Sequence, residues 1–570
     1  MSQPQAFLQQ APAPLAPHPI KVPQASETLL SNGLRIVIVE DRRLPLISYR
    51  LAFRSGDAHD PPELPGLSDL VTGLISEGTE SLSSREIANE VGRIGATLSA
   101  GANSDYTTVA ASSLISFRDN ILDLLADVTR NPSFPPNEVE LIKQNTKESL
   151  RQQRAQPSFL ASEMLSRVVF GKHPYSVIAP TLDSLEAITR ERIVDFHRSR
   201  FLPNNAVFVA VGDVRPEAVI KRVENLFGDW QVGTAPQDDY PAPPERTSRS
   251  AYLVDRPGSA QSNIVIANLA ITRTDPNYFP MLLMHTVLGA NASSRLFMNL
   301  REEKGYTYGA YSSLDARRSA GSFRASAEVR TLVTGASLKE FFFELQRIRT
   351  EPVSEKEIAD AKSYLTGVFP LRLETQEGLI DQLVQIKMFG LPDNYLETYR
   401  QRIQAVTRDQ IQEVAAKYVR PDEAAIVIVG DGAEVLEQLK PYTEAVEIYN
   451  TAGKRKEKPS NPAESGADAA LVLGEWTIDI QTPFGQNIPA KLKVTEGQPG
   501  LRGTVESEMG NADIVSALLD GNSFVATLSF EIGDQVLEAQ IEGQINGKEM
   551  EGTITLQDSP PLSFAGSKTA

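Results

Sequence analysis

The sequence predicts an α+β protein in which two homologous domains are followed by a small all-β module. Three observations support this prediction: a long segment recurs later in the chain, the strand and helix patterns before each copy correspond, and the composition changes after residue 450. A chain of 570 residues has room for three or four domains.

The internal repeat is the clearest signal. Residues 188–213 read ITRERIVDFHRSRFLPNNAVFVAVGD, and residues 406–431 read VTRDQIQEVAAKYVRPDEAAIVIVGD, so the two align without a gap. Each copy has a Thr that can start a helix, a helix, a Pro-bearing turn and an apolar strand ended by Gly-Asp. We expect Asp213 and Asp431, the last residues of the two copies, to cap helices.

The segments before the repeat correspond as well. In the first domain a turn at Asn32-Gly33 and the strand LRIVIVE precede a second strand, LISYRLAF, and SNIVIANLAI is the corresponding strand pair of the second domain. The helices LSDLVTGLISEG and YFPMLLMHTVLG come next, and further helices are predicted at SSREIANEVGRI, FRDNILDLLADVTR and NEVELIKQNTKESLRQQRA. Each domain is therefore predicted to be a sheet backed by helices on one face.

Composition sets the predicted boundaries. Pro-rich, polar or small-residue segments mark linkers, and short alternating strands separated by Gly and Asn turns mark a barrel or sandwich at the C-terminus. The predicted parts are a disordered tether (1–26), the first domain (27–235), a linker (236–250), the second domain (251–450), a second linker (451–472) and the all-β module (473–570).

Several functions are excluded or disfavoured by composition. The chain has no cysteine, which rules out thiol catalysis and disulfides, and no two of its five histidines are close enough to share a helical turn. The net charge of -17 disfavours a nucleic-acid partner and is compatible with cationic substrates or with solubility alone. We find no apolar run of about 18 residues, so no transmembrane segment is predicted.

One run carries a family resemblance. GLSDLVTGLISEGTE, followed by SSREIANEVGRIGATLSAGANSDYTTV, resembles the first domain of the pitrilysin, insulinase and mitochondrial processing peptidase family, and the resemblance extends over about residues 26–450. Catalytic members of that family bear H-x-x-E-H on this helix: two histidines bind zinc, and the Glu between them activates a water molecule.

The resemblance implies that this chain has lost the zinc site. The first His falls on Asp69, the Glu on Thr72 and the second His on Gly73, while the third ligand falls at about Ser149, with Glu148 adjacent. A catalytic zinc needs three protein ligands and a general base, which these residues do not supply. We therefore expect no metal in this chain, and zinc in a partner subunit.

A second motif is retained. SSRLFMNLREEKGYTYGAYSSL resembles the family motif in which an Arg, here Arg301, and a Tyr seven residues later, here Tyr308, reach the zinc site. A phenol there can donate to the tetrahedral oxyanion, and a guanidinium can hold a substrate carbonyl. On composition alone, Arg301 would belong to a solvated charged run and the tyrosines would pack a strand. The resemblance favours the functional interpretation, with Tyr306 as the alternative aromatic residue.

Three functions fit these observations. The first is the non-catalytic subunit of a heterodimeric zinc metalloendopeptidase, inactive alone, which donates Arg301 and Tyr308 to a partner that carries H-x-x-E-H and cleaves peptides or unfolded polypeptides. The second is an inactive scaffold or peptide-binding protein, a heterodimer or homodimer, similar to the core proteins of the respiratory cytochrome bc complex. The third is an active peptidase with an unorthodox site, which is disfavoured because the motif positions supply too few zinc ligands. The N-terminal segment and the resemblance favour a bacterial periplasmic or other extracytoplasmic location over a cytoplasmic one.

Overall fold

The computed structural model describes residues 22–456, and in the C-terminal part residues 469–481, 487–496, 501–508, 510–520, 523–532, 535–556 and 562–569. The chain forms two compact units. The first comprises Met1–Arg249, Val265–Ala327 and Leu338–Ile426, and the second comprises Ser250–Ile264, Glu328–Ser337 and Val427–Ala570. Most of the predicted tether lies outside the described residues.

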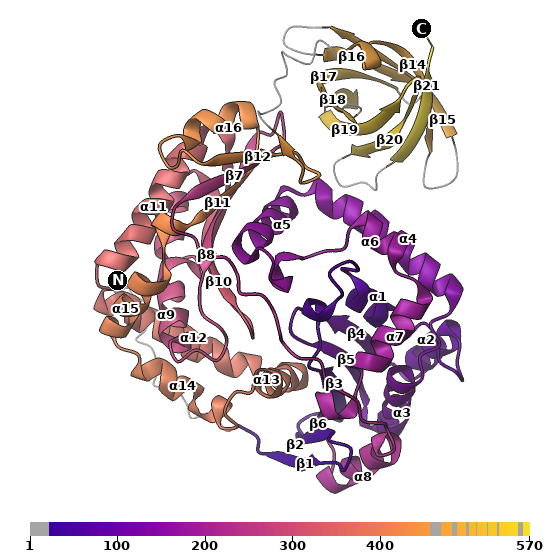
Figure 1. Ribbon diagram of the computed structural model, residues 1–570, viewed down its shortest axis with the longest axis vertical. Helices are drawn as coiled ribbons and strands as arrows, with labels where there is room; N and C mark the ends of the chain where they lie inside the picture. The colour runs from indigo at the N-terminus through magenta and orange to yellow at the C-terminus, as the bar shows by residue number, and fades with distance from the viewer. Residues whose placement is uncertain are drawn as a thin grey trace, which may run out of the picture. The chain divides into compact units, whose positions relative to one another are not determined.

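The first domain is built on a six-stranded sheet with the order β1-β2-β6-β3-β5-β4 (Figure 1). Its strands are β1 (Ala25–Leu29), β2 (Arg35–Glu40), β3 (Leu46–Phe53), β4 (Thr97–Ala102), β5 (Thr107–Leu114) and β6 (Ala206–Gly212). Only β2 and β6 pair in parallel. The apolar strand β6 is buried along its whole length, as expected for a central strand.

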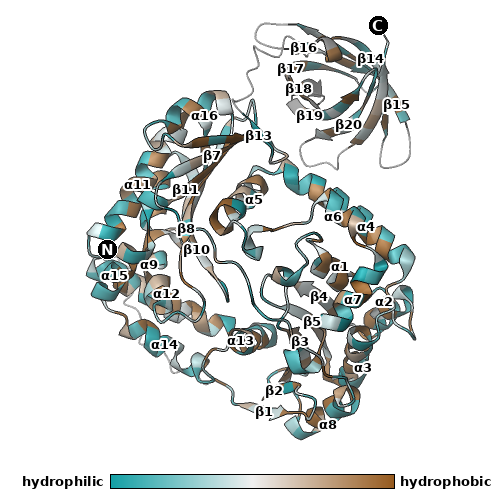
Figure 2. Ribbon diagram, in the orientation of Figure 1, coloured by the Kyte–Doolittle hydropathy of each residue, from teal (hydrophilic) through white to brown (hydrophobic). Residues whose placement is uncertain are grey.

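Helices cover this sheet and supply most of the apolar core with it. They are α1 (Leu67–Leu74), α2 (Ser84–Arg93), α3 (Arg118–Arg130), α4 (Pro136–Ala155), α5 (Pro157–Phe170), α6 (Leu182–Ala187), α7 (Arg190–Arg200) and α8 (Pro216–Phe227). Short 3-10 turns lie at η2 (Asp57–His59), η3 (Ile115–Phe117), η4 (Pro174–Ser176) and η5 (Pro203–Asn205). Helix α4 is predominantly hydrophilic, as its sequence predicts for a surface helix (Figure 2).

The second sheet repeats the topology of the first. Its order is β13-β12-β7-β11-β8-β10-β9, in which the run β7-β11-β8-β10-β9 matches β2-β6-β3-β5-β4 strand for strand. The strands are β7 (Ser250–Asp255), β8 (Gln261–Leu269), β9 (Thr307–Ala316), β10 (Gly321–Arg330), β11 (Ala425–Gly430), β12 (Val446–Tyr449) and β13 (Arg455–Lys456). The internal repeat is thereby confirmed.

The helices of the second repeat follow the same plan. They are α9 (Tyr278–Gly289), α10 (Arg295–Phe297), α11 (Thr334–Thr350), α12 (Glu355–Arg372), α13 (Gln376–Phe389), α14 (Tyr395–Ala405), α15 (Arg408–Tyr418) and α16 (Gly432–Leu439), with a π-helical turn η6 (Met298–Glu303) and 3-10 turns η7 (Thr331–Val333) and η8 (Pro421–Glu423). Thr189 and Thr407 cap α7 and α15 through their side chains, as the repeat predicts.

Some predicted details are wrong. SNIVIANLAI forms one strand, β8, and not a pair of strands; the other strand of the pair is β7, which precedes it in the chain. The sequence did not reveal β7 because this strand directly follows the polar linker. Asp431 caps α16 as predicted, but Asp213 does not cap α8, because that helix starts at Pro216, too far along the chain. The tether prediction overlaps β1, which begins at Ala25 and pairs with β2.

The C-terminal module is a closed barrel of eight antiparallel strands, which decides between the barrel and the sandwich (Figure 1). Its strands are β14 (Gly474–Gln481), β15 (Asn487–Glu496), β16 (Leu501–Ser507), β17 (Gly510–Asp520), β18 (Ser523–Ile532), β19 (Gln535–Asn546), β20 (Glu549–Leu556) and β21 (Leu562–Lys568). The fully buried Trp476 donates from Nε1 to the carbonyl of Val472 (2.8 Å), in the short helix α17 (Ala469–Val472). The predicted linker 451–472 therefore contains β13 and α17, while residues 457–468 lie outside the described residues.

We expect a chain that ends at residue 457 to fold without the barrel, because the barrel has its own apolar core. Thermal unfolding followed by fluorescence would report on Trp230 in the first domain, since Trp476 is removed with the barrel. The midpoint should stay within a few degrees of that of the full chain. Loss of the cooperative transition would instead make the barrel an integral part of the fold, since it shares a compact unit with residues 427–456.

Candidate functional site

Helix α1 carries the three positions of the lost zinc motif. The Asp69 carboxylate reaches solvent, whereas Thr72 is buried and donates its hydroxyl to the carbonyl of Asp69 (3.0 Å). A Cβ atom added at Gly73 would lie 2.4 Å from Cδ1 of Ile142 in α4. The side chain of Ile142 therefore occupies the space into which a second histidine would project.

The position of the third ligand is equally unsuited to zinc. Glu148 and Ser149 are both exposed on α4, where Glu148 pairs with Arg151 (3.2 Å) and Ser149 accepts from Gln153 (3.2 Å). Within the ranges that the structure describes, no group of three or more His, Asp or Glu side chains could hold a metal ion. The residues at the motif positions do not fit a catalytic zinc.

We expect the isolated chain to bind no stoichiometric zinc. Asp69 is one carboxylate where three ligands are required, and neither Thr72 nor Gly73 can complete the set. Elemental analysis after dialysis against buffer without chelator measures the metal content directly. One tightly held zinc per chain would contradict the prediction.

Two further carboxylates lie beneath α1. Asp60 accepts the backbone N–H groups of Gly66 (2.8 Å) and Ser68 (3.0 Å), which fixes the start of the helix. Burial raises the pKa of Asp60 to about 7. Burial and then the charge of Asp69 raise the pKa of Asp57 to about 6.

The raised pKa of Asp57 predicts a pH-dependent stability. Because the folded-state pKa of Asp57 lies above the ordinary value of 3.8, the stabilising contribution is complete below about pH 4 and is lost as the pH rises through about 6. The Asn of an Asp57→Asn variant does not titrate. Between pH 4.5 and pH 7.5, the free energy of unfolding of the wild-type chain should therefore fall by about 1–2 kcal/mol relative to that of the variant. Urea denaturation of both proteins at the two pH values measures the difference. The control is Asp119→Asn, which removes a carboxylate that is 61% exposed, and its stability should depend on pH as that of the wild-type chain does. If both substitutions altered the pH dependence equally, the assignment to Asp57 would be wrong.

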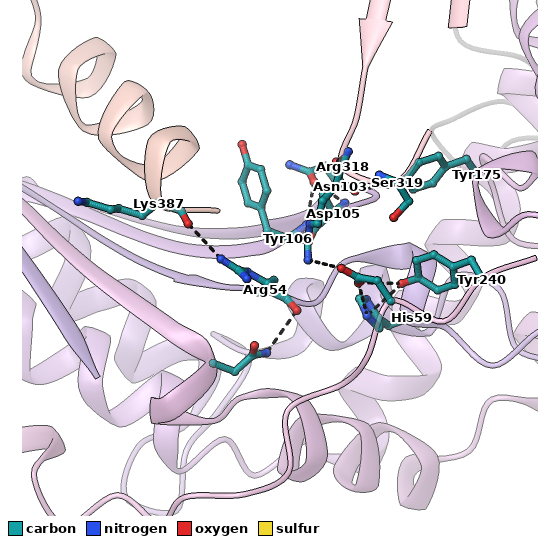
Figure 3. Close-up of polar contacts among 12 residues, drawn as sticks. Arg54, His59, Asn103, Asp105, Tyr106, Tyr175, Tyr240, Arg318, Ser319 and Lys387 are labelled. Carbon is teal, nitrogen blue, oxygen red and sulfur yellow. Dashed lines mark hydrogen bonds and ion pairs between the residues drawn. The ribbon is translucent and has the colours of Figure 1, made fainter. Parts of the chain in front are cut away.

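The tip of the β9–β10 hairpin contacts the first domain, where Arg318 meets Asp105 (Figure 3). Arg317 donates to the Oγ of Ser104 (2.9 Å), and its guanidinium lies 4.8 Å from the ring centroid of Tyr175. The backbone N–H of Arg318 donates to the buried carboxylate of Asp105 (3.1 Å), and its Nη2 donates to the Asp105 carbonyl. The second repeat is thus anchored to the first through two arginines.

The interdomain linker joins the same network. Arg318 pairs with Asp238 (3.1 Å), which lies 3.2 Å from the Nε2 of His59, and the hydroxyl of Tyr240 lies 3.0 Å from the same nitrogen (Figure 3). His173 packs edge-on against Tyr240, and burial lowers its pKa to about 4. Sequence reasoning missed this cluster because the linker composition alone suggested no specific contacts.

Tyr308 lies at the start of β9, and Arg301 lies in the turn that precedes this strand. Arg301 is in the π-helical turn η6, with its side chain 46% exposed and its guanidinium 4.7 Å from the ring centroid of Phe297. Tyr308 is 90% exposed, whereas the alternative residue, Tyr306, is half-buried. The structure therefore leaves the Tyr308 ring accessible to a second molecule. Among the described residues, Arg301 contacts Glu302 and Phe297, and no hydrogen bond or ring contact joins it to Tyr308.

The turn that carries Arg301 is rigidly supported. The buried Arg295 donates two hydrogen bonds to Glu357 (2.6 and 3.1 Å). Burial by itself would raise the pKa of Glu357, but the pairing with Arg295 lowers it to about 2. Asn299 donates to the buried Glu344 (3.0 Å). π-helical turns are frequent at functional sites, and this one could not be recognised from the charged run alone.

The two sheets have equivalent edge strands. β4 ends the first sheet and β9 ends the second, within the strands that the structure describes. Alternate residues of β4 (Thr97, Ser99 and Gly101) are exposed and small, so an extended chain can approach its edge. The sequence predicted this strand but not which side of it was open.

Fold and site together define a peptidase-like protein of two repeated domains without a usable zinc site. The model of the insulinase family (peptidase family M16) matches residues 35–180, and that of the peptidase M16 inactive domain matches residues 187–365. The chain belongs to this family, and it is an inactive, peptidase-like member. Among the described residues, no helix is long and apolar enough to cross a membrane.

Curated relatives and a solved structure agree with the family assignment. The chain is 24% identical over 408 residues to an uncharacterized zinc protease, YmxG, of Bacillus subtilis, covering 70% of this chain and 97% of that protein. It is 23% identical to the non-peptidase homolog YmxG of Helicobacter pylori, covering 70% of this chain and 91% of that protein. A crystal structure of a peptidase M16 inactive domain from Pseudomonas fluorescens is 26% identical, with a TM-score of 0.68, and covers 72% of this chain and 98% of that one.

Proposed function

We propose that this chain is the non-catalytic subunit of a two-chain zinc peptidase, in which Arg301 and Tyr308 act on substrate held at the zinc of a partner that carries H-x-x-E-H. The observation that carries the proposal is the contrast between the two motifs. The zinc positions are occupied by residues that cannot bind the metal, whereas the Tyr308 ring is 90% exposed at the edge strand β9. An exposed tyrosine at the start of an edge strand suits a residue that acts on another molecule.

The chemistry assigned to the two residues is electrostatic. The Tyr308 hydroxyl donates a hydrogen bond to the oxyanion that develops on the scissile carbonyl in the partner's site. Arg301 holds a substrate carbonyl through its fork of donors, and the stacking on Phe297 restricts the orientation of its guanidinium. Neither residue performs hydrolysis alone, so the isolated chain is inactive.

The test is reconstitution with a zinc-bearing family member from the same organism. The two chains are expressed together and apart, and cleavage of a short unstructured peptide is measured for each chain and for the complex. The proposal requires copurification and cleavage that depends on both chains. Full activity of the partner alone would contradict it.

The alternative is a scaffold or peptide-binding protein without a catalytic role. The open edge of β4, whose exposed residues are small, favours peptide binding in either case, because an added strand can use the unshared backbone groups of that edge. The alternative is preferred if the complex forms and its activity is insensitive to substitution of Arg301 and Tyr308. A periplasmic or other extracytoplasmic location remains part of the proposal, and fractionation of the producing bacterium tests it.

A further inference from the structure

Asn299 lies at the base of the π-helical turn that carries Arg301, and it is only 5% exposed. The backbone N–H of Lys304 donates to the Asn299 carbonyl (3.0 Å), a bond that spans five residues, one more than the bond of an α-helix. The N–H of Gly305 then donates to the Arg301 carbonyl (3.1 Å). Arg301 therefore lies within the widened turn, and the direction in which its side chain projects depends on the shape of that turn.

The side chain of Asn299 fastens this turn to helix α11. Its Nδ2 donates to Glu344 (3.0 Å) and to Glu340 (3.1 Å), two glutamates that lie one helical turn apart. Burial raises the pKa of Glu344, and the hydrogen bond from Asn299 is the first effect that opposes this rise. Because an amide nitrogen has two N–H donors, one side chain holds together two carboxylates that would otherwise repel each other.

The contacts of the Arg301 side chain itself are too weak to place it. The guanidinium lies 4.7 Å from the ring centroid of Phe297, and this ring contacts Tyr311 of β9 (5.7 Å between centroids). A cation above a ring is attracted to its face but is not held at one point of it. Arg301 also pairs with the exposed Glu302 (3.6 Å), and such a surface pair adds little. The backbone of the turn, held by Asn299, supplies the remaining constraint.

We propose that Asn299 is a positioning residue for substrate binding: by fastening the π-helical turn to helix α11, it holds Arg301 in the orientation in which its guanidinium reaches a substrate carbonyl. Asn299 is buried and acts only through Arg301. The inference rests on the proposed function, because the role of Arg301 is taken from it. A guanidinium that is held in place before the substrate arrives loses less conformational entropy on binding.

Steady-state kinetics of the reconstituted complex test the proposal with Asn299→Leu, which removes both donors at similar volume. KM for a short unstructured peptide should rise about tenfold. In an Arg301→Ala background the same substitution should change KM by less than about twofold, because the group that Asn299 positions is absent. A complex in which part of the protein is merely unfolded would instead show a lower kcat at unchanged KM in both backgrounds.

A milder variant and an assay on the isolated chain keep the test decisive if Asn299→Leu folds poorly. Glu340→Ala removes one of the two hydrogen bonds at a helix position that suits Ala, and KM of the complex should rise about threefold. In the isolated chain, trypsin should cut after Arg301, whose side chain is 46% exposed, about tenfold faster in Asn299→Leu than in the wild-type chain, because the turn opens more often. Mass spectrometry of the fragments over time measures this rate.

The control is Asn277→Leu, which makes the same substitution at the start of α9, where Asn277 donates to Asp275 (3.0 Å) and to Tyr418 (3.2 Å). It should change neither KM nor the cleavage after Arg301. If the effects of Asn299→Leu and Arg301→Ala on KM add, or if Asn299→Leu changes neither KM nor the cleavage, the positioning role is overturned while the proposed function stands. If Arg301→Ala by itself leaves KM and kcat unchanged, the proposed role of Arg301 fails, and the positioning role fails with it.

Discussion

A Tyr308→Phe complex with the zinc-bearing partner should turn over peptide about 10²-fold more slowly than the wild-type complex. The substitution removes one hydroxyl and almost no volume, and because the ring is 90% exposed, the fold of this chain should not change. A donor that acts mainly in the transition state lowers kcat with little change in KM. Steady-state kinetics of the reconstituted pair on a short unstructured peptide gives both constants.

Two further variants define the assignment. Tyr306→Phe should leave kcat nearly unchanged, because Tyr306 is the half-buried tyrosine of the motif. Arg301→Ala should raise KM as well as lower kcat, since the guanidinium also holds the substrate before reaction. An unchanged kcat in the Tyr308→Phe complex would remove the catalytic role and leave the scaffold alternative.

An Arg318→Ala variant should be less stable than the wild-type chain by about 2–3 kcal/mol. The side chain is only 14% exposed, and its loss leaves Asp238 and the carbonyl of the buried Asp105 without their charged partner. Because Asp238 lies in the linker between the repeats, the variant should also be cleaved faster there by a protease. Urea denaturation and limited proteolysis measure the two effects.

The control is Arg324→Ala, which changes the same residue type in the same hairpin. Arg324 is exposed and donates to the Oγ of Ser313 (2.6 Å), so its loss should cost less than about 0.5 kcal/mol. If the two variants are equally stable, the network around Arg318 does not hold the repeats together. If both variants are cleaved faster, the hairpin as a whole, and not Arg318 alone, protects the linker from the protease.

The sequence alone determined the repeat, the loss of the zinc motif and the presence of a separate all-β module. These features are local: the aligned copies at 188–213 and 406–431 specify the same helix, turn and buried strand, and a motif that lacks its histidines cannot bind zinc in any fold. The roles of Arg301 and Tyr308 came from family resemblance, and they stay predictions because no bound partner tests them.

Only the tertiary structure decided which groups meet. Arg318 and Asp105 are distant in the sequence, and nothing in the linker composition indicated that Asp238 would lie beside them. The position of β4 at the end of its sheet depends on strand order, and the sheet also contacts α13, which comes from the second repeat. Periodicity encodes which side of a strand or helix is buried, but pairing between distant segments depends on the whole packing arrangement, and no local pattern records it.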